Sequence, residues 1–267
     1  MKSRDTLAGE IRTREFVRCL GLVAAVTLIR LIGLRFSRVD LYFDESQYWS
    51  WAQIPAFGYY SKPPLIAWII AATERICGSG EACIRSASPI FYFGTALLVY
   101  ALANMLYGRR AAFWAALAFT FTTGVVFSAR IISTDVPLLF FWALALIAYV
   151  KLLRGGGWAW AIVLGLSLGL GLLAKYMMGC FVLCIGIAAL FDRDARALLT
   201  APKLWVAFVI GAALLAPNLW WNLENGFATI LHTGDNIRGS GAVFSLKNGF
   251  AFLAAQFAVF GPIAFGS

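Results

Sequence analysis

The segment Pro64-Leu-Ile-Ala-Trp-Ile-Ile-Ala-Ala-Thr73 decides how this chain passes through a membrane. The segment is apolar, but Glu74 and Arg75 interrupt it at about half the roughly 20 residues that a spanning helix needs. We therefore predict an interfacial or re-entrant helix that does not cross the bilayer, with Pro64 in its first turn.

The rest of the chain is typical of a polytopic membrane protein. Of its 267 residues, 61% are hydrophobic, against roughly 45–50% in soluble domains. Apolar runs of near-spanning length predict an all-α bundle of about eight transmembrane helices. The predicted spans are 16–36, 84–107, 111–128, 136–150, 158–174, 176–191, 204–222 and 248–264.

The distribution of positive charge tests the choice made for residues 64–76. If this segment does not span, the basic connections all lie on one side, as expected for cytoplasmic loops. If it did span, they would alternate between the two sides. These basic residues are Arg4, Arg12 and Arg14, then Arg109 and Arg110, then Lys151 and Arg154, then Arg193, Arg196 and Lys203. The net charge of +9 therefore reflects membrane anchoring with a cytoplasmic N-terminus, and we expect no nucleic-acid partner.

The same assignment gathers the polar residues that could do chemistry on the opposite, external face. Such convergence is needed by an active site built from several loops on a helical scaffold. The residues are Asp44, Glu45, Lys62, Arg130, Asp135, Lys175 and His232.

The adjacent acids Asp44 and Glu45 are unusual in a chain with only 13% charged residues. One interpretation is structural, because acids are favoured at the start of a juxtamembrane helix. The other is catalytic, because ionisable groups at a membrane are usually functional. The catalytic interpretation also accounts for the rings of Tyr48, Trp49 and Trp51, which suit a sugar face or a lipid.

Three further positions have both a structural and a functional interpretation. Lys62, before Pro63-Pro64, either snorkels or binds a lipid-linked phosphate. Lys175 lies between two apolar runs with almost no loop, so it should face a cavity or pair with an anion. Asp135, in Ser133-Thr-Asp-Val-Pro-Leu138, either caps a helix or contributes to the site.

The cysteines and the single histidine give weaker signals. Cys19, Cys180 and Cys184 lie in apolar runs and are expected to pack as small hydrophobic residues. Cys77 and Cys83 could close a short loop in an oxidising compartment, or remain thiols. His232, predicted to lie in a loop, is a weak metal-ligand candidate that Glu224 or Asp235 could join.

Five segments, in order, resemble the GT-C membrane glycosyltransferases. The resemblance is to the dolichyl-phosphate-mannose protein mannosyltransferase-like group, which includes the bacterial aminoarabinose transferase of lipid A. The segments are Asp44-Glu-Ser-Gln-Tyr-Trp49, Gly58-Tyr-Tyr-Ser-Lys-Pro-Pro-Leu65, Ser133-Thr-Asp-Val-Pro-Leu138, Gly171-Leu-Leu-Ala-Lys-Tyr176 and Pro217-Asn-Leu-Trp-Trp-Asn222.

The resemblance implies an inverting enzyme of the bacterial inner membrane that transfers a sugar from a polyprenyl-phosphate carrier at the external face. The acceptor would be a glycolipid, a glycan or a protein, and the sugar is left open. By resemblance, Asp44 is the base, Asp135 is the supporting acid, and Lys62 and Lys175 contact the carrier phosphate. Glu45 joins the catalytic acids, and the expected substrate-binding residues also include Tyr59, Tyr60 and Arg130.

We assign no certain cofactor, and the need for a divalent metal is left open. The base accepts the proton of the acceptor hydroxyl while cations stabilise the departing phosphate, and the two lysines could replace a metal in that task. In the aminoarabinose branch a Glu beside the lysine helps to hold a metal, whereas Ser61 precedes Lys62 here. His232 falls in a comparable region.

The chain ends at Phe265-Gly-Ser267, whereas members of the resembling family continue into further helices and often a soluble domain. We expect residues 1–267 to form the N-terminal part of a GT-C transmembrane domain, either as a fragment or as a minimal version with a partner. Two other classes stay open: a transporter or lipid flippase, which would carry polar groups near the membrane midplane, and a non-catalytic truncated subunit.

Overall fold

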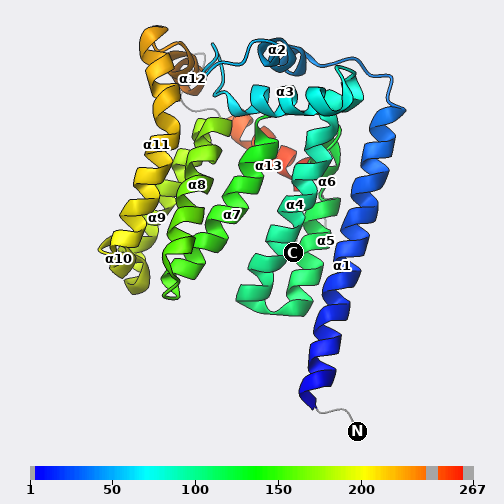
Figure 1. Ribbon diagram of the computed structural model, residues 1–267, viewed down its shortest axis with the longest axis vertical. Helices are drawn as coiled ribbons and strands as arrows, with labels where there is room; N and C mark the ends of the chain where they lie inside the picture. Colours follow the sequence, from blue (N-terminus) through cyan, green and yellow to red (C-terminus); the bar gives the residue numbers. More distant parts are fainter. Residues whose placement is uncertain (1–3, 239–245, 261–267) are drawn as a thin grey trace. The chain divides into compact units, whose positions relative to one another are not determined.

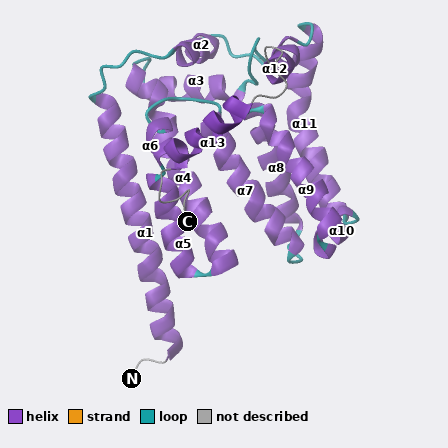
Figure 2. Ribbon diagram, turned by 180° about the vertical axis from the view of Figure 1, so that it is seen from behind, coloured by secondary structure: helices purple, strands orange, loops and turns teal. Residues whose placement is uncertain are grey.

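The computed structural model describes residues 4–238 and 246–260, and the regular elements within these residues are all helical (Figures 1 and 2). The helices belong to two compact units. The first consists of Met1–Asp40, Glu81–Ile132 and Ser245–Ser267, and the second of Leu41–Gly80 and Ser133–Phe244.

The first unit is built on a helical hairpin that packs against one long helix. The hairpin turns at Gly108, whose φ of 85° favours glycine. The core of the unit includes Cys19 of the long helix and Ala96, Tyr100 and Ala112 of the hairpin. Helix α1 packs against both α4 and α5, and α13 contacts α6. The helices are α1 (Arg4–Arg35), α4 (Glu81–Tyr107), α5 (Arg109–Phe121), α6 (Thr123–Ser128) and α13 (Leu246–Phe260).

The predicted span 111–128 is not one continuous helix, which corrects the sequence analysis. Thr122 adopts an extended ψ of 131° and separates α5 from α6. The guanidinium of Arg30 donates to the carbonyl oxygen of Thr120 at 2.6 Å, which satisfies one carbonyl at the end of α5. Hydrophobicity continues through this break, so the sequence pattern did not reveal it.

The second unit carries most of the predicted site. Its helices are α2 (Phe43–Ala52), α3 (Leu65–Cys77), α7 (Asp135–Leu153), α8 (Trp158–Ala174), α9 (Gly179–Phe191), α10 (Arg193–Leu199), α11 (Pro202–Glu224) and α12 (Ala228–Arg238), with a 3-10 turn at Tyr176–Met178. Helix α8 packs against both α7 and α11. Helices α2 and α3 run across the end of this bundle where α7 begins, and α10 lies at the opposite end (Figure 1).

Small residues bring α8 and α11 close together. A Cβ atom added to Gly165 would lie 2.7 Å from the Ala207 carbonyl oxygen, and one added to Gly169 would lie 2.7 Å from Cβ of Leu214. Real Cβ atoms do not approach so closely, so larger side chains here would push α11 away from α8. This packing fixes the position of α11, the helix that carries Asn218 and Asn222.

Four of the described helices are long and apolar enough to cross a membrane. They are Arg14–Arg35, Glu81–Tyr107, Asp135–Leu153 and Pro202–Glu224, while α8 and α9 are shorter apolar helices. Helix α3 has 13 residues, which confirms that a helix lies in the predicted segment 64–76. The chain is an all-α polytopic membrane protein, which confirms the predicted fold class.

The five cysteines lie in both units. Cys19 is buried in the first unit, and Cys180 and Cys184 lie on α9 in the second; all three are free thiols. Cys77 ends α3 in the second unit and Cys83 lies in α4 in the first, so their pairing stays a prediction.

Candidate active site

The two adjacent acids lie in the first turn of α2, but their environments differ. The backbone N–H of Tyr42 donates to Oε2 of Glu45 at 3.0 Å, so Glu45 caps this helix and is only 1% exposed. Asp44 is exposed. The structural interpretation therefore holds for Glu45, and Asp44 is the acid that a substrate could reach.

Tyr48 lies one turn after Asp44 on α2. Its side chain is buried, and this burial raises the pKa of its phenol. The Asp44 and Asp135 carboxylates lie near enough to raise that pKa further. The sequence predicted that the Tyr48 ring suits a sugar face or a lipid, whereas the side chain is buried in the structure.

Asp135 and Lys175 form an ion pair. Nζ of Lys175 donates to Oδ1 of Asp135 at 2.7 Å, with the two side chains 32% and 51% exposed. Asp135 begins α7, and no side-chain cap bond is made by its N-cap residue Thr134. Lys175 lies in extended backbone between α8 and the 3-10 turn. The expected anionic partner of Lys175 is thus present within the chain itself.

Tyr59 and Tyr60 point to different surroundings. Tyr59 is buried, its ring stacks on Trp51 at 4.9 Å, and its hydroxyl accepts from the Ala56 N–H at 2.9 Å. Burial raises the pKa of Tyr59, although the bond from Ala56 opposes this. We therefore assign Tyr59 a structural role in the loop, whereas the exposed Tyr60 remains available to a substrate.

The expectation that His232 lies in a loop is wrong, because it lies in α12. Positive φ angles at Gly226 and Phe227 end α11 and redirect the chain before this short polar helix begins. The imidazole lies 5.1 Å from the ring of Tyr60, which brings α12 to the same loop. Among the described residues there is no group of three His, Cys, Asp or Glu side chains able to hold a metal.

A buried polar network holds the loop that carries these tyrosines. Nδ2 of Asn218 donates to the Phe57 carbonyl oxygen at 2.7 Å, and the Tyr176 hydroxyl donates to Oδ1 of Asn218 at 2.7 Å. Asn222 accepts from the Thr229 N–H at 3.2 Å. Asn218 and Asn222 are 1% and 0% exposed, and only their amides on α11 can satisfy these partners. The network also fixes the residue next to Lys175.

Two further contacts position α2 and the loop. Trp49 Nε1 and Gln53 Nε2 donate to the Glu74 carboxylate at 2.8 and 3.0 Å, which ties α2 to α3. Gly58 packs against the indole of Trp221, where an added Cβ would lie 2.2 Å from Cε3. Sequence reasoning missed these contacts because their partners lie far apart in the chain.

The remaining predicted residues are placed as follows. Lys62 is half-buried after the loop, and no ion pair is made by it among the residues that the structure describes. Arg130 is exposed but belongs to the first unit, so its part in the site stays a prediction.

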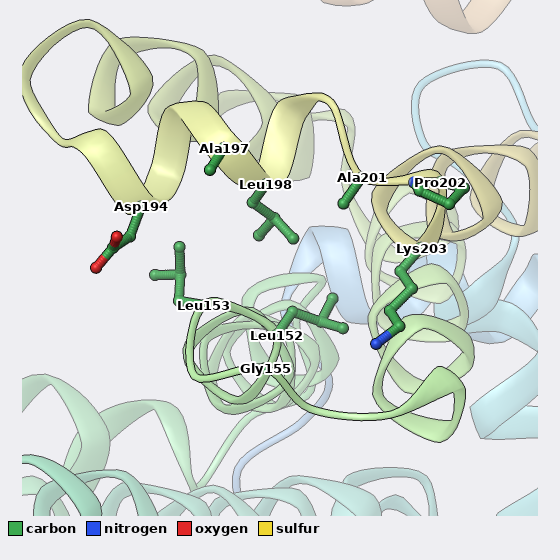
Figure 3. Close-up of a pocket in the computed structure, with 9 residues that line it drawn as sticks. All are labelled: Leu152, Leu153, Gly155, Asp194, Ala197, Leu198, Ala201, Pro202 and Lys203. Carbon is green, nitrogen blue, oxygen red and sulfur yellow. The ribbon is translucent and has the colours of Figure 1, made fainter.

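A pocket of about 290 Å³ lies at the other end of α7, away from these residues (Figure 3). Leu152 and Leu153 point toward Leu198 of α10, and the ammonium of Lys203 donates to the Gly156 carbonyl oxygen at 2.9 Å. Within the second unit, the basic residues Lys151, Arg154, Arg193 and Arg196 also gather at this end. The acids and Lys175 thus lie at one end of the unit and this basic cluster at the other, as the sequence predicted.

The fold and the clustered acids and lysine define the GT-C class of helical membrane proteins. The profile of the dolichyl-phosphate-mannose-protein mannosyltransferase family matches residues 61–221, and the chain belongs to this family. ArnT from Cupriavidus metallidurans, solved in the apo state, has the same fold: the TM-score is 0.70 at 18% identity, over 95% of this chain and 49% of ArnT.

Two curated relatives are named as galacturonosyltransferases. The lipid A galacturonosyltransferase RgtD of Rhizobium johnstonii is 39% identical over 245 residues, covering 91% of this chain and 51% of RgtD. The lipopolysaccharide core galacturonosyltransferase RgtA of the same organism is 26% identical, covering 91% of this chain and 50% of RgtA. The chain spans about half the length of the curated relatives it matches.

Proposed function

We propose that this chain is the N-terminal part of an inverting galacturonosyltransferase of the bacterial inner membrane. Its donor would be galacturonic acid on a polyprenyl phosphate, and its acceptor the lipid A or core region of lipopolysaccharide. The N-terminus would be cytoplasmic and the site would face the periplasm. The sugar and acceptor are suggested by the relatives, and the donor class by the chemistry of the site.

The observation that carries this proposal is the cluster formed by Asp44, Tyr48, Asp135 and Lys175. It presents one exposed carboxylate on α2 and one accessible ammonium between α8 and α9 at the same end of the second unit. A lipid-linked phosphate requires a cation at the membrane surface, and an acceptor hydroxyl requires a base. Lys175 would be that cation and Asp44 that base, both on the helical scaffold of the second unit.

In the proposed reaction, the carboxylate of Asp44 accepts the proton of the acceptor hydroxyl as its oxygen attacks the anomeric carbon. The bond between that carbon and the phosphate oxygen breaks, and the electron pair leaves with the polyprenyl phosphate. Lys175, held by Asp135, and Lys62 stabilise the negative charge on the phosphate. A single displacement of this kind inverts the configuration of the sugar.

The closing test uses membranes that contain the 267-residue chain, radiolabelled polyprenyl-phosphate galacturonic acid and lipid A. We expect label in lipid A with the wild type and a loss of about 100-fold or more with Asp44→Asn, the typical contribution of a general base. Asp194→Asn, at the opposite end of the unit, is the matched control and should transfer at the wild-type rate. Transfer that survives Asp44→Asn undiminished excludes Asp44 as the base, and no transfer by any variant contradicts the proposed activity of this chain.

A further inference from the structure

A second cavity lies in the first unit, and no part of the proposed reaction uses it. Its volume is about 280 Å³, and its walls come from α1 and α5, which pack against each other. Helix α1 contributes Glu15 and Arg18, and α5 contributes Arg110, Phe113 and Trp114. The cavity therefore combines two guanidinium groups, one carboxylate and two aromatic rings.

The two arginines of this cavity have no protein partner among the described residues. No ion pair or side-chain hydrogen bond is made there by Arg18 or Arg110. By contrast, Arg30 on the same helix donates to the Thr120 carbonyl oxygen, and Arg196 donates to carbonyl oxygens at the end of α9. The cavity thus holds two exposed guanidinium groups and a net positive charge, which favours an anionic ligand.

The position of the cavity along the helices indicates that its ligand would lie at the membrane surface. Arg18 lies within the first turns of the candidate membrane span Arg14–Arg35, and Arg110 lies in the first turn of α5. Trp114 is 61% exposed, as expected for a ring in the interfacial layer of a bilayer. A ligand in this cavity would have its polar part at the membrane surface and its apolar part beside the helices.

We propose that this cavity binds the headgroup of an anionic phospholipid. The phosphodiester lies between the guanidinium groups of Arg18 and Arg110, which can each donate two parallel hydrogen bonds to it. The first part of the acyl chain packs against Phe113 and Trp114. The Glu15 carboxylate accepts from hydroxyl groups of the headgroup, which favours phosphatidylglycerol over a headgroup without hydroxyls.

The test measures lipid binding by native mass spectrometry of the full chain released from detergent. Phosphatidylglycerol and phosphatidylcholine with the same acyl chains are titrated separately, and inorganic phosphate is added as a competitor. Arg18→Gln with Arg110→Gln should weaken phosphatidylglycerol binding about 25-fold, since each arginine near a membrane surface contributes roughly 1 kcal/mol. Arg14→Gln removes the same charge from the same helix outside the cavity and should leave binding within about twofold of the wild type.

Three outcomes overturn the proposal. Undiminished phosphatidylglycerol binding by the double variant excludes the arginines, and equal binding of phosphatidylcholine excludes recognition of net charge. Displacement of the lipid by millimolar inorganic phosphate indicates a site for a free anion instead. If the double variant does not fold, Arg110→Gln alone, which leaves α1 intact, should still lower binding about fivefold.

Discussion

Replacing Lys175 by methionine should reduce activity far more than it reduces stability. The Lys175 ammonium and the Asp135 carboxylate are 2.7 Å apart, but their side chains are 32% and 51% exposed. In water the Coulomb attraction at that distance is about 1.5 kcal/mol, and ordering the two side chains offsets part of it. Measured exposed pairs contribute about 0.2–1 kcal/mol, so the free energy of unfolding should fall by no more than that.

The expected effect on catalysis is larger because Lys175 would stabilise charge that develops only in the transition state. Loss of one such donor typically lowers the rate by about 100- to 1,000-fold. Asp135→Asn should have a smaller effect on transfer, since Asp135 acts by holding Lys175 in place. In the double variant the loss should not exceed that of Lys175→Met alone, because both changes act on one unit.

The assay combines the initial rate of sugar transfer with the melting temperature in detergent for the wild type, the two single variants and the double variant. Lys151→Met is the matched control, because this half-buried lysine lies at the other end of the second unit. The reasoning is refuted if Lys175→Met keeps a third or more of the wild-type rate. It is also refuted if the coupling energy in stability exceeds about 2 kcal/mol.

Two further predictions concern packing and pH. Gly58→Ala places a Cβ 2.2 Å from Trp221, so the free energy of unfolding should fall by about 1–3 kcal/mol. Adding Trp221→Leu should restore part of this loss. An unchanged melting temperature in Gly58→Ala would contradict the contact. Gly21→Ala, with nothing within 4 Å, is the control. The pKa of Tyr48 is raised above the value of about 10 in the unfolded chain, so the folded state retains its proton longer and stability falls as pH rises past 10. Between pH 9 and 11 the wild type should lose melting temperature faster than Tyr48→Phe, and equal slopes would show that Tyr48 is not in this environment.

The helices and their class could be predicted from the sequence because hydrophobic length is a strong signal in a membrane protein. Residues 64–76 were too short to span, and α3 is indeed a helix of 13 residues. The break at Thr122 and the helix around His232 were missed for opposite reasons. The first is hidden inside an apolar run, and the second is a short helix in a stretch that is not apolar as a whole.

The site was predicted less completely than the fold, because only charge distinguishes its residues in the sequence. Asp44, Asp135 and Lys175 stand out as ionisable groups in an apolar chain, and they lie at one end of the second unit. Glu45 carries the same signal, yet its carboxylate caps α2. Asn218 and Asn222 are uncharged, and their role in the site depends on hydrogen-bond partners elsewhere in the chain. Phe57, the partner of Asn218, is 161 residues away. Such partnerships exist only in three dimensions.

The bond between Asn218 and Phe57 also sets an order of events during synthesis. The chain emerges from the ribosome N-terminus first, so α2 and its acids enter the membrane surface long before α11 exists. Until Asn218 and Trp221 arrive, the loop from Phe57 to Tyr59 lacks the amide and the indole that hold it. A nascent chain halted before residue 218 would therefore carry α2 with Asp44 but leave the loop from Phe57 to Tyr59 unsupported, so the proposed site would be complete only after α11 is inserted.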